Sequence, residues 1–172
     1  MDLSTLNELK TNKDRNILSL SDKKPVLLIF LRHFGCIYCR ASLKEISKKK
    51  DFFKSKNVDL VFFHMAENKQ ADKYFSEHGL ANAEHISDPE TKIYANFGLE
   101  KGSLNQLFGL KNWIRGFEAM SSGTFIELKQ VGDGFQMPGV FLVYKQKLEG
   151  SYIHHYASDS PDYEDMLKCC IN

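Results

Sequence analysis

The chain has 172 residues, which fits one domain because single domains commonly run about 100–200 residues. Hydrophobic residues make up 42% and aromatic residues 12%, a composition that excludes an extended disordered chain. Lys and Arg number 23 against 22 Asp and Glu, so no overall field favours nucleic acid or an anionic membrane. We therefore expect a single domain over residues 1–172, no nucleic-acid partner, and partners chosen by individual sites.

Targeting and membrane signals are weak in this sequence. The first residues, MDLSTLNELKTNKDRN, are polar, whereas a secretory signal needs a basic start followed by an apolar stretch. No later segment approaches the roughly 18–20 unbroken apolar residues that span a bilayer. Four cysteines are too few for a disulfide scaffold, and paired thiols in a reducing compartment are more often catalytic or metal-binding. The sequence thus predicts a cytoplasmic protein without a membrane span.

The first half of the chain predicts alternating helices and strands. Apolar runs predict buried strands, and apolar residues at helical spacing predict amphipathic helices. The predicted elements are a short helix over residues 3–9, a strand over 26–31, a helix that follows two thiols and ends near Asp51, a strand over 58–65 and a helix over 68–80 with Gly79 near its end. This order favours parallel strands joined by right-handed crossovers.

The second half predicts shorter elements. They are a short strand or turn over 85–90, a helix over 91–99 closed by Gly98, two short helices within 103–120, an irregular connection over 121–137 with 124–128 extended, two strands around a polar turn at 145–150, and a closing helix over 162–170. Periodicity alone therefore predicts an α/β domain.

Two cysteines lie two residues apart directly after the first apolar run, in the segment LRHFGCIYCR. A helix N-terminus presents unpaired amides and the positive end of the helix dipole, and both favour thiolate over thiol. One cysteine can then react, and the second can resolve a mixed disulfide. The alternatives are inert packing or half of a zinc site, which ordinarily needs a second ligand pair at suitable spacing. We favour redox use of Cys36 and Cys39 and expect neither a metal nor a cofactor.

Several segments together resemble the peroxiredoxin-like branch of the AhpC/TSA antioxidant family. These segments are PVLLIFLRHFGCIYCRASLKEI, SDPETKIYANFGL, GDGFQMPGVFLVY and DYEDML, and the similarity runs from about residue 24 to 168. The resemblance implies a thioredoxin-like fold, with a central mixed sheet flanked by helices and a helical insertion at 103–120 before the final β-hairpin. It also implies thiol-dependent redox activity and a cytoplasmic setting.

The resemblance leaves the attacking cysteine open. The typical peroxiredoxin pattern would place the peroxidatic cysteine on Cys39 and the active-site threonine on Cys36, whereas thioredoxin chemistry would use Cys36 as the attacker. Cys39 shares a helical stripe with Leu43 and Ile46, so we expect it to be more buried, which raises a thiol pKa. We therefore assign the attack to Cys36.

Three further residues are candidates for binding or activation. Thioredoxin folds carry a cis-proline before the strand that faces the thiols, and the resemblance places Pro138 there; typical peroxiredoxins have an arginine at this place. Arg32 precedes Cys36 by four residues and could supply a positive charge, against the alternative of a solvated surface arginine. His33 could shuttle protons or be a plain loop histidine.

The predicted function is a thiol oxidoreductase that reduces a peroxide or disulfide substrate through Cys36 and resolves it through Cys39. The resemblance implies recycling by thioredoxin or another dithiol donor, and an association of some relatives with lipid endoperoxides keeps an apolar substrate open. A non-catalytic module that senses redox state or binds a protein is the alternative.

Other features are secondary candidates. The segment 103–120, with Trp113 and Phe117, could cover the thiol site, form a substrate groove or make a homodimer contact, although packing against the sheet is the favoured reading. Cys169 and Cys170 could exchange disulfides with the Cys36 and Cys39 pair. We favour the alternative in which one of them packs against the protein and the other lies in a frayed chain end. His64 falls at a strand end near the expected crevice, where a buried, hydrogen-bonded histidine explains it equally well.

Overall fold

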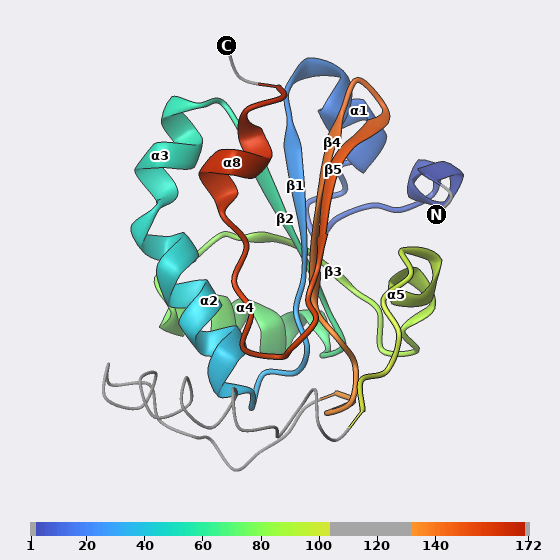
Figure 1. The fold of residues 1–172 in the computed structure, drawn as a ribbon, viewed down its shortest axis with the longest axis vertical. Helices are drawn as coiled ribbons and strands as arrows, with labels where there is room; N and C mark the ends of the chain where they lie inside the picture. Colours follow the sequence, from blue (N-terminus) through green and yellow to red (C-terminus); the bar gives the residue numbers. More distant parts are fainter. Residues whose placement is uncertain (1–2, 104–131, 171–172) are drawn as a thin grey trace.

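The computed structural model describes residues 3–103 and 132–170, which form a five-stranded mixed sheet with helices on both faces (Figure 1). The elements in chain order are η1 (Leu3–Asn7), α1 (Ile17–Lys23), β1 (Val26–Phe30), α2 (Ile37–Lys48), α3 (Lys50–Ser55), β2 (Asp59–His64), α4 (Asn68–Glu77), β3 (Glu84–Ser87), α5 (Lys92–Asn96), β4 (Gly139–Tyr144), β5 (Lys147–Ile153) and α8 (Tyr163–Leu167). Within these ranges no helix is long and apolar enough to cross a membrane.

The strand order is β3-β2-β1-β4-β5, so β1 is the central strand. β1 runs parallel to β2, which runs parallel to β3, whereas β4 is antiparallel to both β1 and β5. In this register Phe30, the last residue of β1, pairs with Phe63 on one side and with Gly139 on the other. The carboxyl end of β1 is therefore flanked by the end of β2 and the beginning of β4.

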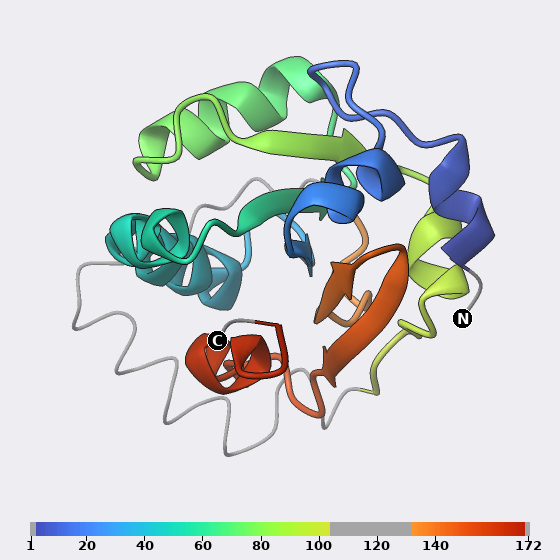
Figure 2. The same ribbon diagram turned by 90° about the horizontal axis from the view of Figure 1, so that it is seen from above.

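Every residue of β1 is buried because helices cover both faces of the sheet, which explains its unbroken run of apolar residues. Leu27 and Ile29 pack in the core that α2, α3, α4 and α8 cover, and Leu28 and Phe30 pack in the core beneath η1, α1 and α5. Figures 1 and 2 show these two helical layers on opposite sides of the sheet. The chain thus buries two separate apolar faces around one strand.

Most predicted elements are present, with some differences in their bounds. The helix after the thiols ends at Lys48, before the predicted end near Asp51, and after Lys49, whose N–H bonds to the Glu45 and Ile46 carbonyls, the chain continues as α3. The final hairpin turns at Lys145 and Gln146, both with positive φ, so the predicted polar turn at 145–150 was too long. The predicted insertion at 103–120 and the extended stretch at 124–128 lie outside the described residues, apart from residue 103.

Helix α1 was not predicted from the sequence. Asn16 is its N-cap, and the Asn16 side chain accepts a hydrogen bond of 3.0 Å from the backbone N–H of Ser19. An asparagine before an apolar pair is a recognised start signal, so the capping pattern was the cue available in the sequence. The closing helix was placed correctly but is shorter than predicted, and it begins after Asp162, whose carboxylate accepts from two backbone N–H groups.

Tyr94 of α5 fixes the backbone where β1 and β2 end. Its hydroxyl lies 2.5 Å from the carbonyl oxygen of Leu31 and 3.0 Å from that of Phe63. Tyr94 is fully buried, and the Asp88 carboxylate holds the start of α5 by accepting from three backbone N–H groups. Tyr94 therefore fixes the backbone next to Arg32, and it does so from the face of the sheet opposite to α2.

Replacing Tyr94 by Phe should lower the free energy of unfolding by about 1 kcal/mol, because the Leu31 and Phe63 carbonyls lose the one hydroxyl proton that they share while the ring keeps its packing. Urea denaturation measures this change. The matched control is Tyr144→Phe, on a partly exposed side chain of β4, for which we expect less than about 0.5 kcal/mol. Equal effects of the two variants would contradict a supporting role for the Tyr94 hydroxyl.

Candidate functional site

The two thiols lie where β1 passes into α2. Cys36 is the N-cap of α2, with an extended backbone at φ −78° and ψ 123°, and Cys39 lies in the first helical turn. The Cys36 N–H donates to the His33 carbonyl at 3.0 Å, and the Cys36 carbonyl accepts from Arg40 at 3.1 Å. The short loop and the helix start therefore place both sulfurs at the carboxyl end of the central strand.

Hydrogen bonds connect the two sulfurs to Arg32. The guanidinium donates from Nη1 to Cys36 Sγ at 3.3 Å, and the backbone N–H of Arg32 donates to Cys39 Sγ at 3.3 Å. The Cys39 thiol in turn donates to the Cys36 sulfur. Cys36 is 5% exposed and Cys39 4%, so Cys39 is the more buried thiol, as expected, although the two exposures differ little. Hydrogen bonding, not burial, separates the two cysteines.

The two thiols have opposite pKa shifts. The hydrogen bond from Cys39 and the Arg32 charge lower the pKa of Cys36 to about 6, although burial works in the other direction. Donating to Cys36 and being buried raise the pKa of Cys39 well above its ordinary value. The amino end of α2 adds the positive end of a helix dipole at the same place. These shifts favour a thiolate on Cys36 and a thiol on Cys39.

Arg32 is buried rather than solvated, because a distant loop holds its guanidinium. Nη2 donates to the carbonyl oxygen of Gly134, and Nε has no hydrogen-bond partner among the residues that the structure describes. That loop is fixed in turn: Asp133 accepts a hydrogen bond from the Phe135 N–H and forms a 2.8 Å ion pair with Lys101. The Gly134 carbonyl was not singled out from the sequence, since a main-chain acceptor has no residue-type signal.

His33 lies in the loop that precedes Cys36, and Pro138 lies on the side of the neighbouring strand β4, directly before the residue that pairs with Phe30. His33 is partly exposed, and burial together with the Arg32 charge lowers its pKa to about 4, so the ring is neutral at neutral pH. Pro138 is buried directly before Gly139, beside the end of β1. The Met137–Pro138 peptide bond is trans, since no cis peptide bond occurs in the described part of the chain, and the expectation of a cis-proline was wrong.

Tyr74 of α4 secures the other end of the thiol loop, which the sequence did not indicate. Its hydroxyl donates to the carbonyl oxygen of Phe34, and it accepts a 3.1 Å hydrogen bond from Arg40 Nε. The Tyr74 and Phe34 rings stack with centroids 4.1 Å apart. Tyr74 lies 34 residues beyond Arg40 in the chain, so only the tertiary fold brings the two side chains to this loop.

His64 is a buried histidine in a hydrogen-bonded chain. Its Nε2 lies 2.9 Å from Nδ1 of His85, whose Nε2 lies 3.0 Å from the Asp72 carboxylate. Burial lowers the pKa of His64 to about 3, so its ring is neutral. The ring packs against Phe34 of the thiol loop, with centroids 5.5 Å apart. This geometry agrees with the structural alternative for His64.

The suggested relay from the C-terminal cysteines does not fit the structure. In Figure 1 the chain beyond α8 lies at one end of the sheet, and the start of α2 lies at the other. The Cys169 sulfur is near the Glu149 carbonyl of β5, at the level of the β4 residues that pair with the first residues of β1, whereas Cys36 follows the last residues of β1. Five residues of strand, about 15 Å, separate these places.

Comparison with known proteins identifies the family. The family model of the AhpC/TSA antioxidant enzymes matches residues 45–158, a range that begins after Cys39. A chloroplastic thioredoxin-like protein of Arabidopsis thaliana is 28% identical over 158 residues, covering 87% of this chain, which spans 62% of the length of that relative. A prostamide/prostaglandin F synthase of Salmo salar is 30% identical over 158 residues, covering 87% of this chain and 76% of the synthase.

A solved structure supports the fold. The bacterioferritin comigratory protein of Xanthomonas campestris, which has alkyl peroxide reduction activity, superposes with a TM-score of 0.61 at 11% identity, covering 88% of this chain and 83% of that one. The mixed five-stranded sheet flanked by helices is therefore the thioredoxin-like arrangement that the sequence predicted. The chain belongs to the AhpC/TSA antioxidant enzyme family and has a thioredoxin-like fold.

Proposed function

We propose that this protein reduces a peroxide or disulfide substrate through Cys36, resolves the product through Cys39, and is recycled by a thioredoxin-type dithiol. The observation that carries the proposal is the set of donors on the Cys36 sulfur. Arg32 Nη1 and the Cys39 thiol both donate to it, at the amino end of α2. These contacts stabilise a thiolate, which is the form that attacks peroxides and disulfides.

With a peroxide, the Cys36 thiolate attacks one oxygen of the O–O bond. The S–O bond forms as the O–O bond breaks, Cys36 becomes a sulfenic acid, and the departing alkoxide takes a proton to leave as an alcohol. The Cys39 thiol then attacks the Cys36 sulfur, which releases water and leaves a disulfide. A reduced dithiol donor restores both thiols and is itself oxidised to a disulfide.

Arg32 supports this chemistry as a fixed positive charge. Its Nη1 and Nη2 donate to Cys36 and to the Gly134 carbonyl, which leaves Nε as a donor without a partner in the described part of the chain. Negative charge moves from sulfur to the departing oxygen during the attack, and a preorganised guanidinium beside that path lowers its energy. His33, neutral at neutral pH, is available in the same loop to accept or pass a proton.

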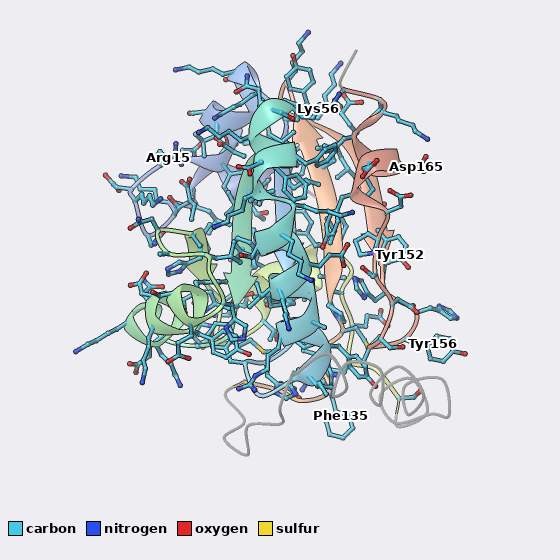
Figure 3. The ribbon with its side chains drawn as sticks, turned by 90° about the vertical axis from the view of Figure 1, so that its left-hand side faces the viewer. Arg15, Lys56, Phe135, Tyr152, Tyr156 and Asp165 are labelled. Carbon is cyan, nitrogen blue, oxygen red and sulfur yellow. The ribbon has the colours of Figure 1, made fainter. Side chains whose placement is uncertain are left out.

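An apolar substrate suits the surroundings of the site. Tyr38, next to Cys39 in α2, packs against the buried side chains of Met137 and Ala157. Phe135 is 44% exposed and projects outward from the end of the molecule where α2 begins (Figure 3). The synthase relative acts, by its name, on a lipid-derived substrate. An organic hydroperoxide is therefore a better first substrate to assay than hydrogen peroxide.

A non-catalytic redox sensor is the second candidate, favoured by the burial of both sulfurs. Such a protein would form the disulfide reversibly but would turn over no substrate. A cytoplasmic setting belongs to either proposal as a prediction, and one relative is named as chloroplastic.

Replacing Cys36 by Ser should reduce turnover of an organic hydroperoxide by about 1,000-fold, because the attacking thiolate is lost. A coupled assay with thioredoxin and its reductase measures this. Cys39→Ser should instead accumulate a mixed disulfide with the dithiol donor, visible by mass spectrometry. The control variant, with Ser at Cys169 and Cys170, should keep full turnover. Full activity in the Cys36→Ser variant would exclude this mechanism, and a reversible disulfide without turnover would favour the sensor.

The thiolate absorbance of Cys36 should rise with a midpoint near pH 6, below the ordinary thiol pKa of 9.0. The hydrogen bond from Cys39 is the larger cause, so Cys39→Ala should move the midpoint toward higher pH by more than Arg32→Met does. Ultraviolet titration is the measurement, in a background with Ser at Cys169 and Cys170. A larger shift in Arg32→Met would assign the leading role to the guanidinium instead.

A further inference from the structure

The last described residues carry a second pair of sulfurs, far from the first. Cys169 Sγ and Cys170 Sγ lie 3.3 Å apart, immediately after α8. Cys169 is exposed, whereas Cys170 is partly buried against the core under α8. Neither sulfur has a part in the chemistry proposed for Cys36. This pair is therefore an unassigned dithiol on the surface of the protein.

The end of α8 explains why the two sulfurs converge. Successive side chains in a regular helix diverge by about 100°, so adjacent cysteines within a helix would point apart. Here α8 ends at Leu167, and the Cys170 N–H donates to the Leu167 carbonyl at 3.1 Å, three residues back. This tighter turn brings the Cys169 sulfur within 3.5 Å of the Met166 carbonyl and beside the Cys170 sulfur.

The separation of the sulfurs decides which kind of atom they can hold together. With bonds to sulfur of about 2.3 Å, two sulfurs 3.3 Å apart subtend an angle of about 90° at the bound atom. Tetrahedral zinc needs a wider angle of about 110° and further ligands. A linear two-coordinate ion needs the sulfurs still farther apart. A trivalent arsenic atom, pyramidal because of its lone pair, has angles near 90° and is thiophilic.

We propose that Cys169 and Cys170 form a bidentate binding site for a trivalent arsenical, one per chain. With an arsine oxide, two S–H bonds and the As–O bond are replaced by two As–S bonds, and the oxygen leaves as water with both protons. The organic group fills the third position on arsenic, so no further protein ligand is needed. Arsenic stays trivalent and no residue is oxidised.

A disulfide between the same two cysteines is disfavoured by geometry. Adjacent Cα atoms lie about 3.8 Å apart, below the roughly 4.4–6.8 Å of ordinary disulfides, so the eight-membered ring strains the peptide. Burial and the Cys169 contact also raise the pKa of Cys170 to about 12, which slows its attack on an oxidised partner. Bridging by one larger atom keeps the sulfurs at the separation they already have.

The test uses the full chain with Ser at Cys36 and Cys39, so that the first dithiol cannot contribute, and phenylarsine oxide as the probe. Intact mass spectrometry should show one phenylarsenic group per chain and the loss of both free thiols. Adding either Cys169→Ser or Cys170→Ser should weaken binding about 100-fold, because the second sulfur no longer acts at high effective concentration. An excess of a monothiol should leave the adduct in place, whereas 2,3-dimercaptopropanol should remove it.

A second comparison covers the case in which the Cys36 and Cys39 changes impair folding. The otherwise wild-type chain with Ser at Cys169 and Cys170 should bind one phenylarsenic group fewer than the wild-type chain, with unchanged peroxide turnover. Equal stoichiometry in these two proteins would overturn the proposal. So would adducts of equal affinity in the single-cysteine variants, or an adduct that a monothiol displaces, because each result means that one sulfur binds alone.

Discussion

The stabilisation of one negative charge on the Cys36 sulfur is the constraint on which the site depends. The sulfur is buried, and burial alone favours the neutral thiol. Arg32 and the Cys39 thiol reverse that preference by donating hydrogen bonds to the sulfur. The positive end of the helix dipole at the start of α2 also favours the thiolate. A buried arginine is itself costly unless it is paired, so the thiolate and the guanidinium each make the other tolerable.

The fold keeps these groups together by holding the thiol loop at both ends. Tyr94 reaches the Leu31 carbonyl from the layer of α1 and α5, and Tyr74 reaches the Phe34 carbonyl from α4 in the other layer. The loop between them carries Arg32, whose guanidinium is held a third time by the Gly134 carbonyl. Groups locked by such supporting contacts need little reorganisation when a reaction begins. The layered sheet is thus what positions the chemistry.

The sequence predicted the parts of this arrangement that depend on local pattern. The apolar run of β1 and the Cys-x-x-Cys after it placed Cys36 at the start of a helix, because both signals lie within a few neighbouring residues. It could not predict the carbonyl of Gly134, about a hundred residues away, since any residue type offers that acceptor. Helical periodicity correctly placed Cys39 on the buried face of α2, but it could not show that Cys36 is buried almost as deeply, because periodicity does not describe the loop before the helix.

The coupling between the two thiols gives the proposed cycle a direction. Cys39 keeps its proton because it donates to an anion, and this contact is the first cause of its raised pKa. Once Cys36 has given its electron pair to a substrate, the anion is gone and so is the reason for Cys39 to remain protonated. Arg32 still donates its backbone N–H to the Cys39 sulfur and still carries its charge nearby, and both favour the thiolate. Oxidation of the first sulfur therefore activates the second, which is the order that a resolving cysteine requires.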